Sequence, residues 1–477
     1  MQFNSLAFLI FFPLVTLIYF LLPHRYRWIH LLAASCVFYC FFIPVYIFIL
    51  FFTITIDYWA GRWIEQAQGR NKKMFLVLSV IANLSVLVIF KYFNFLIDNM
   101  NMLLHVFHIA TRPIPFLSII LPIGLSFHTF QAMSYTIEVY RGHQKAERHF
   151  GIYALYVMFY PQLVAGPIER PQNLLHQFYE EHEFDYGNLL SGLRQMLWGL
   201  FKKVVIADRL AHFINPVFDA PGDFNAINLI LALIFFAFQI YFDFSGYSDI
   251  ALGAARVMGF KLMRNFHHPF QSKSVTEFWR RWHISFSTWF SDYIYMPFVM
   301  ARRYWGRYAI VAGLVITFLL SGLWHGAGWT FVIFGLLHGL AMIYEFMTKK
   351  IRARIAKRMS PWIYGVFSQA ATFAFLVFSW LFFRAPTFHV AGLFMHKIFS
   401  CDQHFFLYRY MLDFGWFSFL VCLSCTVFVL IVERFVDPEL SLLDKSPRWD
   451  LAFCIATLYL IVCLGVFDQQ SFIYFQF

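Results

Sequence analysis

The stretch SGLWHGAGWTF, residues 321–331, lies between two apolar runs, 308–324 and 328–347, each long enough to enter a bilayer. It holds His325 at the break between them, and an ionisable residue at membrane depth is costly enough to be a functional candidate. Imidazole also exchanges a proton near neutral pH. Three glycines around the histidine leave room for a ligand or a second backbone: Gly322, Gly326 and Gly328. The alternative is a helix-to-helix turn that carries an interfacial histidine.

The composition predicts an all-α integral membrane protein. Of the 477 residues 60% are hydrophobic and only 13% are charged, which leaves too little polar surface to cover a soluble core. The net charge of +11 does not indicate nucleic-acid binding. The basic residues lie in short loops between apolar runs, where they favour the cytoplasmic side of the membrane. The segment 349–358 holds six cations and no acid, so we expect it to be cytoplasmic.

Seven cysteines form no disulfide framework. Cys401 stands alone in a polar loop, and the pair Cys422 and Cys425 is expected to pack in the core. The first apolar run, Leu6–Leu22, has no basic region before it and no cleavage site after it, so it is expected to remain as a span.

The hydropathy pattern predicts about eleven crossings plus re-entrant and interfacial helices. We expect a break at Pro44, a polar connection over 99–114, a re-entrant or interfacial hairpin over 151–171 and an interfacial helix over 194–209. The predicted spans in the rest of the chain are 74–97, 115–140, 227–241, 308–324, 328–347, 363–383, 412–432 and 450–467. No inverted repeat is visible, which argues against a transporter.

A second candidate site is SVTEFWRRWHISFSTW, residues 274–289. Ser274 and Glu277 form a capping-box pattern, so we expect one helix to begin there and to run to 290. On it a shared face would carry Trp279, His283, Phe286 and Phe290, and Glu277 is spaced to pair with Arg281. The alternative is an amphipathic interfacial helix with belt aromatics and arginines directed to phosphates.

Two further groups of polar residues are less specific. DFSGYSD, residues 243–249, follows the predicted span 227–241, where Asp and Ser more often serve as caps than as substrate contacts. His128 and Gln131 lie in the segment 115–140, whose density of polar residues fits a helix that lines a cavity, although packing is the alternative for His128. We expect no metal site, since His267 and His268 are adjacent and have no helping carboxylate.

Seven blocks resemble the membrane-bound O-acyltransferase (MBOAT) family, in the bacterial branch that acetylates alginate and peptidoglycan. They are FNSLAFLIFFP, LPIGLSFHTFQAMSY, FYPQLVAGPIERP, IYFDFSGYSDIALG, FWRRWHISFSTWFSDYIY, LSGLWHGAGWTF and FIYFQF. The resemblance implies a ring of transmembrane helices around a thinned central funnel or tunnel. The chain departs from the branch at Ser291, at PFVMARR (297–303), at His267 and His268, and at His128, which affects the substrate more than the reaction class.

The resemblance further implies a single domain over 1–477, with a catalytic part about 115–345 and C-terminal helices over 363–477. It implies an O-acetyltransferase of the bacterial inner membrane that passes acetyl from cytoplasmic acetyl-CoA toward an extracytoplasmic polysaccharide, with a periplasmic or membrane-anchored acetyltransferase as partner. Besides these partners we expect membrane lipids and no tightly bound cofactor. The alternatives are a polar-solute transporter and a non-catalytic component of an export complex.

Under this hypothesis His325 and His283 are catalytic, line one tunnel and lie within roughly 12 Å of each other. His325 would be a general base or would carry the acetyl group briefly, and His283 would orient or polarise the thioester. Coenzyme A would be held by Arg280, Arg281, Trp279 and Trp282. The expected substrate or tunnel residues are Trp324, Gly326, Gly328, Asp243, Ser245, Ser248, Asp249, His128 and Gln131.

Overall fold

The computed structural model describes residues 1–109, 113–118, 121–400, 415–435, 447–467 and 472–473. Cys401 and the last four residues of the closing FIYFQF block lie outside this described part. The regular structure of the described residues consists of helices, with no strand among them. The prediction of an all-α chain is therefore confirmed.

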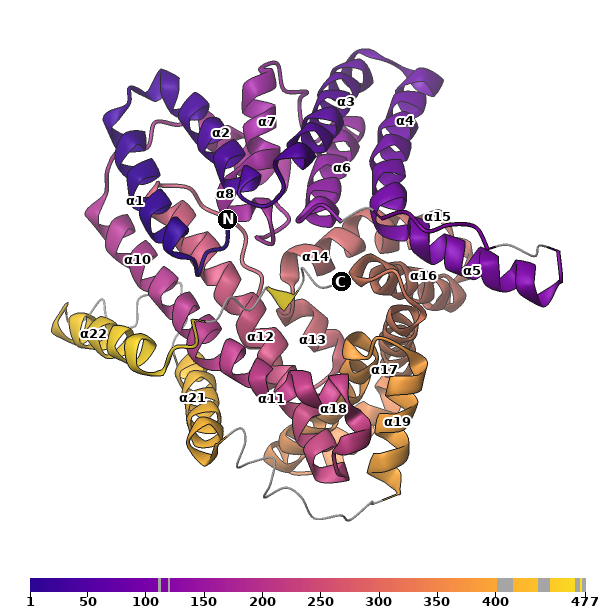
Figure 1. Ribbon diagram of the computed structural model, residues 1–477. Coiled ribbons are helices and arrows are strands. Elements are labelled where there is room, and N and C mark those ends of the chain that lie inside the picture. The colour runs from indigo at the N-terminus through magenta and orange to yellow at the C-terminus, as the bar shows by residue number, and fades with distance from the viewer. Residues whose placement is uncertain (110–112, 119–120, 401–414, 436–446, 468–471, 474–477) are drawn as a thin grey trace. The chain divides into compact units, whose positions relative to one another are not determined.

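The chain divides into two compact units, unit 1 with Met1–Met196 and Ile250–Met263, and unit 2 with Leu197–Asp249 and Arg264–Phe477. Figure 1 labels the helices. Those of unit 1 are α1 (Leu6–Leu21), α2 (His24–Cys40), α3 (Ile47–Gln66), α4 (Gly69–Leu87), α5 (Phe93–Val106), α6 (Leu125–Arg141), α7 (Phe150–Met158), α8 (Tyr160–Leu163), α9 (Pro171–Leu174) and most of α10 (Tyr186–Phe201). Those of unit 2 are α11 (Asp208–Asp219), most of α12 (Ala226–Val257), α13 (Val275–Arg281), α14 (Ile284–Phe290), α15 (Met296–Ala301), α16 (Arg307–His325), α17 (Trp329–Arg358), α18 (Pro361–Arg384), α19 (Phe388–Phe399), α21 (Trp416–Phe435) and α22 (Pro447–Leu464).

Within the described residues seven helical stretches are long and apolar enough to cross a membrane, so the protein is a multi-pass membrane protein. They are Pro44–Gln66, Gly69–Val106, Ala226–Val257, Arg307–His325, Trp329–Arg358, Pro361–Arg384 and Trp416–Arg434. Two shorter apolar helices, Leu6–Leu21 and Leu451–Leu464, add to these. The total of eleven crossings, the central funnel and the single-domain division stay predictions.

Unit 1 shows the expected break at Pro44, because α2 ends at Cys40 and a single 3-10 turn precedes α3. The expected polar connection over 99–114 is wrong in its first half. A π-helical turn, Val88–Tyr92, joins α4 to α5, and α5 continues to Val106. The segment predicted as re-entrant forms α7 and α8, of nine and four residues, both too short to span a bilayer.

In unit 2, α16 and α17 form the out-and-back hairpin that the two apolar runs predict (Figure 1). Glycines allow the two helices to approach closely. A Cβ atom on Gly322 would meet the carbonyl oxygen of Phe331, and one on Gly335 would meet the carbonyl oxygen of Phe318. The space at Gly322 is thus filled by a second backbone, which is one of the two uses predicted for it. This packing fixes the position of the residues at the end of α16.

Candidate active site

His325 is the last residue of α16 and is only 4% exposed. Its imidazole lies among four aromatic rings, with centroid distances of 5.2 Å to Phe286, 5.0 Å to Trp324, 5.8 Å to Phe334 and 5.2 Å to Phe383. The rings come from α14, α16, α17 and α18. The histidine therefore lies at the turn between α16 and α17, as expected, but in the packed interior of unit 2.

The glycines after His325 serve this packing. A Cβ atom on Gly326 would collide with the ring of Phe331, so the residue lets the start of α17 fold back beneath the histidine. Gly328 has more space, with the same ring 3.5 Å from the position of its Cβ. A role of either glycine in binding substrate stays a prediction.

His283 does not lie on a continuous helix, which corrects the expected single helix over 274–290. Ser274 does cap α13, since its hydroxyl accepts from the backbone N–H of Glu277 at 3.0 Å. However, α13 ends at Arg281 and α14 begins at Ile284. His283 between them has φ 44° and ψ 56°, in the left-handed region that a residue with a side chain seldom adopts. The predicted common face of Trp279, His283, Phe286 and Phe290 is therefore wrong.

The break is held by a neighbouring segment, residues 265–267. The backbone N–H of Ile284 donates to the Asn265 carbonyl oxygen, and that of His267 donates to the Arg281 carbonyl oxygen, both at 2.9 Å. The Ser285 hydroxyl donates to Oδ1 of the Asn265 side chain at 2.6 Å. Three hydrogen bonds thus bracket His283 and compensate for its strained backbone, which costs roughly 1–3 kcal/mol.

The two histidines meet around one ring. Phe286 stacks on His283 with centroids 4.8 Å apart, and it also contacts His325 at 5.2 Å. The two imidazole centroids are thus no more than about 10 Å apart, the sum of these distances, which lies inside the 12 Å limit set above. Trp324 also bridges them, at 6.1 Å from His283 and 5.0 Å from His325. The two nearby imidazoles therefore share Phe286 and Trp324 as neighbours.

Burial sets the protonation of His283. The side chain is fully buried, and this loss of solvation holds the pKa of its imidazole well below its usual range. The ring is consequently neutral at neutral pH and able to donate one hydrogen bond and accept another.

A cavity of about 420 Å³ reaches Phe286 from the outside of unit 2. Exposed Arg280 and buried Trp279 line it from α13, and Thr317 and Ser321 line it from α16. Ser321 stands one helical turn before His325. The cavity is thus lined both by a guanidinium and by the ring that contacts the two histidines.

The other residues expected to hold coenzyme A lie elsewhere. Arg281 forms the predicted ion pair with Glu277, with Nη2 and Oε1 2.8 Å apart. Trp282 packs among Phe266, Phe278 and Trp380 and does not line the cavity. Of the four candidates, Arg280 and Trp279 are therefore the two that the cavity brings together.

Comparison with known proteins decides the family. Residues 143–386, which contain both histidines and the cavity, match the membrane-bound O-acyltransferase (MBOAT) family. The chain belongs to this family. Its reaction class is therefore O-acyl transfer, as the sequence motifs indicate.

Three relatives illustrate the range of the similarity. A probable alginate O-acetylase AlgI of Pseudomonas syringae pv. tomato is 38% identical over 405 residues, which cover 84% of this chain and 75% of the relative. A peptidoglycan O-acetyltransferase of Helicobacter pylori is 36% identical over 386 residues, 74% of this chain and 70% of the relative. A teichoic acid D-alanyltransferase of Bacillus subtilis is 28% identical over 278 residues, 56% and 69% of the two chains.

This MBOAT chain has a further buried histidine, His338, which the sequence analysis did not single out. His338 of α17 is fully buried, and its Nδ1 accepts from Nε1–H of Trp279 at 3.1 Å. Its proton must therefore be on Nε2, which is 3.0 Å from the Ser379 hydroxyl. His338 thereby fixes the indole that lines the cavity. The sequence signal that could have pointed to His338 is its place as an ionisable residue inside an apolar run.

The DFSGYSD segment is not a helix end, so its prediction as a site of caps and turns is wrong. It lies inside the 32-residue helix α12. A Cβ atom on Gly246 would come within 2.6 Å of the Gly199 carbonyl oxygen, so the helix packs closely on the chain just before Lys202 and Lys203. These two lysines are 2% and 7% exposed, which also contradicts the predicted interfacial helix over 194–209 at these positions.

The buried lysines form ion pairs with carboxylates from distant parts of the sequence. Nζ of Lys202 is 2.5 Å from Asp249 and 3.4 Å from Glu433. Nζ of Lys203 is 2.7 Å from both Asp208 and Asp243. The two aspartates expected to contact substrate are thus partners of lysines within unit 2. A role of Ser245 and Ser248 in substrate binding stays a prediction.

His128 and Gln131 of α6 lie in unit 1. Nε2 of His128 is 2.5 Å from the Thr53 hydroxyl of α3, and Nε2 of Gln131 donates to the Tyr156 carbonyl oxygen at 2.6 Å. Both side chains therefore hold helices of unit 1 together, and their expected part in the substrate path stays a prediction.

Proposed function

We propose that this MBOAT protein is an O-acetyltransferase of the bacterial cytoplasmic membrane. It takes acetyl groups from cytoplasmic acetyl-CoA and passes them toward hydroxyl groups of an extracytoplasmic polysaccharide. The names of the relatives at 36–38% identity, an alginate O-acetylase and a peptidoglycan O-acetyltransferase, support the acetyl group and the class of acceptor. The seven candidate spans support a location in the membrane.

The observation that carries the proposal is the pairing of the two histidines around Phe286 at the inner end of the cavity. Acyl transfer to a hydroxyl needs a base for the hydroxyl proton and a hydrogen-bond donor for the carbonyl oxygen that becomes negative. Two imidazoles about 10 Å apart at most supply one group for each task. Phe286 would have to turn aside for substrate to lie between them.

The proposed reaction is a direct transfer. His325 takes the proton of the acceptor hydroxyl as the oxygen attacks the thioester carbonyl carbon, and neutral His283 donates a hydrogen bond to the carbonyl oxygen. The carbon–sulfur bond then breaks, and the leaving thiolate takes the proton from His325. Arg280 at the cavity would hold a phosphate of coenzyme A. A periplasmic or membrane-anchored acetyltransferase would receive the transferred acetyl group and pass it on to the polysaccharide.

The experiment measures transfer of radiolabelled acetyl from acetyl-CoA by purified, full-length protein in lipid nanodiscs. We expect His325→Ala and His325→Gln to lower turnover about 10²–10⁴-fold while the protein still elutes as a folded species. His389→Ala is the control, because this histidine of α19 is exposed. Near wild-type turnover in both His325 variants would exclude the catalytic role. A wild-type protein that moves no acetyl group would favour the transporter or scaffold alternatives.

A further inference from the structure

A second cavity of unit 2, of about 490 Å³, has a different character from the first. It lies between the C-terminal half of α17 and the N-terminal half of α18, with the beginning of α13 at one side. Both α17 and α18 are candidate membrane spans. The cavity therefore opens where two spans end, near their connection at 359–360, which is the level of lipid headgroups.

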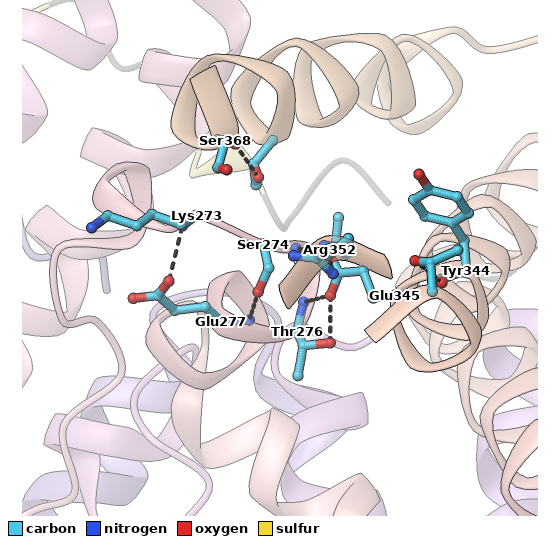
Figure 2. A network of polar contacts seen from close by, with 11 residues as sticks. Lys273, Ser274, Thr276, Glu277, Tyr344, Glu345, Arg352 and Ser368 are labelled. Atoms are coloured by element: carbon cyan, nitrogen blue, oxygen red, sulfur yellow. Dashed lines mark hydrogen bonds and ion pairs between the residues drawn. The ribbon is translucent and has the colours of Figure 1, made fainter. Parts of the chain in front are cut away.

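Two cations border this cavity, Lys273 and Arg352 (Figure 2). The Lys273 ammonium is exposed and has no ion pair with any described residue. In the same part of the chain Arg352 has one long ion pair, with Nη1 3.9 Å from Oε1 of Glu345. Both cations consequently have donors left for a phosphate.

Glu345 is one carboxylate against two cations, so the cavity keeps a net positive charge, and most hydrogen bonds of this carboxylate go to α13. It accepts from the backbone N–H of Val275 at 2.6 Å, and from the N–H and hydroxyl of Thr276 at 3.0 and 2.6 Å (Figure 2). These bonds satisfy the first turn of α13. The carboxylate also supports the helix that carries Arg280 and Trp279 of the candidate active site.

Most of the remaining lining is apolar or aromatic, and the side chains of Ser368 and Thr372 add two hydroxyl groups to it. Tyr344, Phe367 and Ile355 are 64%, 67% and 45% exposed, and Phe375 and Met359 complete the wall. An aliphatic chain would cover these groups, whereas a free phosphate or a sugar would leave them in water. Cations next to exposed aromatic groups at the end of a span are typical of contacts with anionic lipid.

We infer that this cavity binds an anionic glycerophospholipid, with the phosphate at the cationic rim to which Lys273 and Arg352 contribute and the acyl chains along the apolar and aromatic wall. The neighbouring basic block 349–358 attracts such lipids, and the cavity fixes one of them in place. This lipid site is separate from acetyl transfer and does not depend on the proposed function.

The test measures thermal unfolding of the full-length protein in detergent as phosphatidylglycerol is added. We expect the lipid to raise the melting temperature of the wild type. Lys273→Gln combined with Arg352→Gln should weaken its apparent affinity about thirtyfold, since each direct contact with the bound phosphate contributes about fivefold. The matched control is Lys349→Gln with Arg354→Gln, which removes the same charge from exposed positions that do not line the cavity.

Two variants keep the test valid if loss of Arg352 disturbs Glu345. Lys273→Gln alone should weaken binding about fivefold, and Ala371→Trp should block the cavity without changing its charge. Equal affinity in these variants and in the control would overturn the proposal. An equal shift with inorganic phosphate or with phosphatidylcholine, or displacement of the lipid by acetyl-CoA, would also overturn it.

Discussion

The backbone turn at His283 offers the sharpest test of the proposed site, through the side chain of Asn265. This residue is 1% exposed and makes two side-chain hydrogen bonds. Its Oδ1 accepts from the Ser285 hydroxyl at 2.6 Å, and its Nδ2 donates to the Ser248 hydroxyl at 3.4 Å. The substitution Asn265→Ala removes both bonds and leaves the backbone bonds on either side of His283 in place.

The expected effect follows from two opposing energies. Each buried neutral hydrogen bond contributes about 1 kcal/mol, so the variant loses about 2 kcal/mol, with the larger part from the shorter bond. The left-handed conformation of His283 costs a similar amount, roughly 1–3 kcal/mol. Without Asn265 the lost hydrogen-bond energy is as large as the cost of the left-handed conformation, so the turn relaxes and the imidazole moves. Since 1.36 kcal/mol corresponds to a factor of ten in rate, we expect kcat to fall about tenfold to thirtyfold.

The assay is steady-state acetyl transfer by protein in nanodiscs, with kcat and KM measured separately. KM for acetyl-CoA should change little, because Arg280 and Trp279 precede the turn on an intact α13. Ser285→Ala should produce most of the effect and Ser248→Ala less, in the order of the two distances. Asn215→Ala, which also loses one side-chain bond in unit 2, is the control. Unchanged kcat in folded Asn265→Ala would refute the reasoning.

Three further predictions concern other features of the molecule. Phe286→Ala should enlarge the inner end of the cavity and raise the ratio of butyryl to acetyl transfer, and an unchanged ratio would contradict a separating role of the ring. Burial raises the pKa of Glu169 from 4.5 to about 7, so the stability that this carboxyl contributes is complete below about pH 4.5 and is lost as pH rises through 7. Glu169→Gln should therefore have a free energy of unfolding up to about 3 kcal/mol higher than the wild type at pH 8, and a similar one at pH 5. Parallel pH profiles of the two proteins would oppose this. Lys202→Met should destabilise the protein by about 3–5 kcal/mol in thermal unfolding, because it leaves Asp249 and Glu433 without their cation, and adding Glu433→Gln should restore part of the loss; an unaltered melting temperature in the single variant would count against the pairing.

The features that sequence predicted well depend on residues close together in the chain. The break at Pro44, the cap at Ser274 and the ion pair between Glu277 and Arg281 each arise from local geometry. The α16–α17 hairpin follows in the same way from two apolar runs and a glycine-rich turn. Each of these patterns has few alternatives once a helix forms.

The features that sequence missed depend on partners far away in the chain. Nothing within 274–290 marks a break at His283, because the hydrogen bonds that hold it come from 265–267. Lys202 resembles an interfacial cation until Asp249 and Glu433, 47 and 231 residues later, are known to surround it. Local propensity therefore gave the wrong structure wherever a tertiary partner compensated for it.

The DFSGYSD segment shows how these distant contacts bear on the candidate site. Asp243 pairs with Lys203 and accepts from the backbone N–H of Ile473 at 2.8 Å, so this part of α12 is anchored from two sides. The next residue, Phe244, contacts the His283 ring edge-on at 4.7 Å, and Ser248 one turn further accepts from Asn265. The imidazole is thus held by α12 through its ring, while residues 265–267 hold its backbone. These contacts favour a positioning role for the segment over direct contact with substrate. If that is correct, Phe244→Ala should lower kcat as Asn265→Ala does, and Ser245→Ala, which changes no contact with His283, should not.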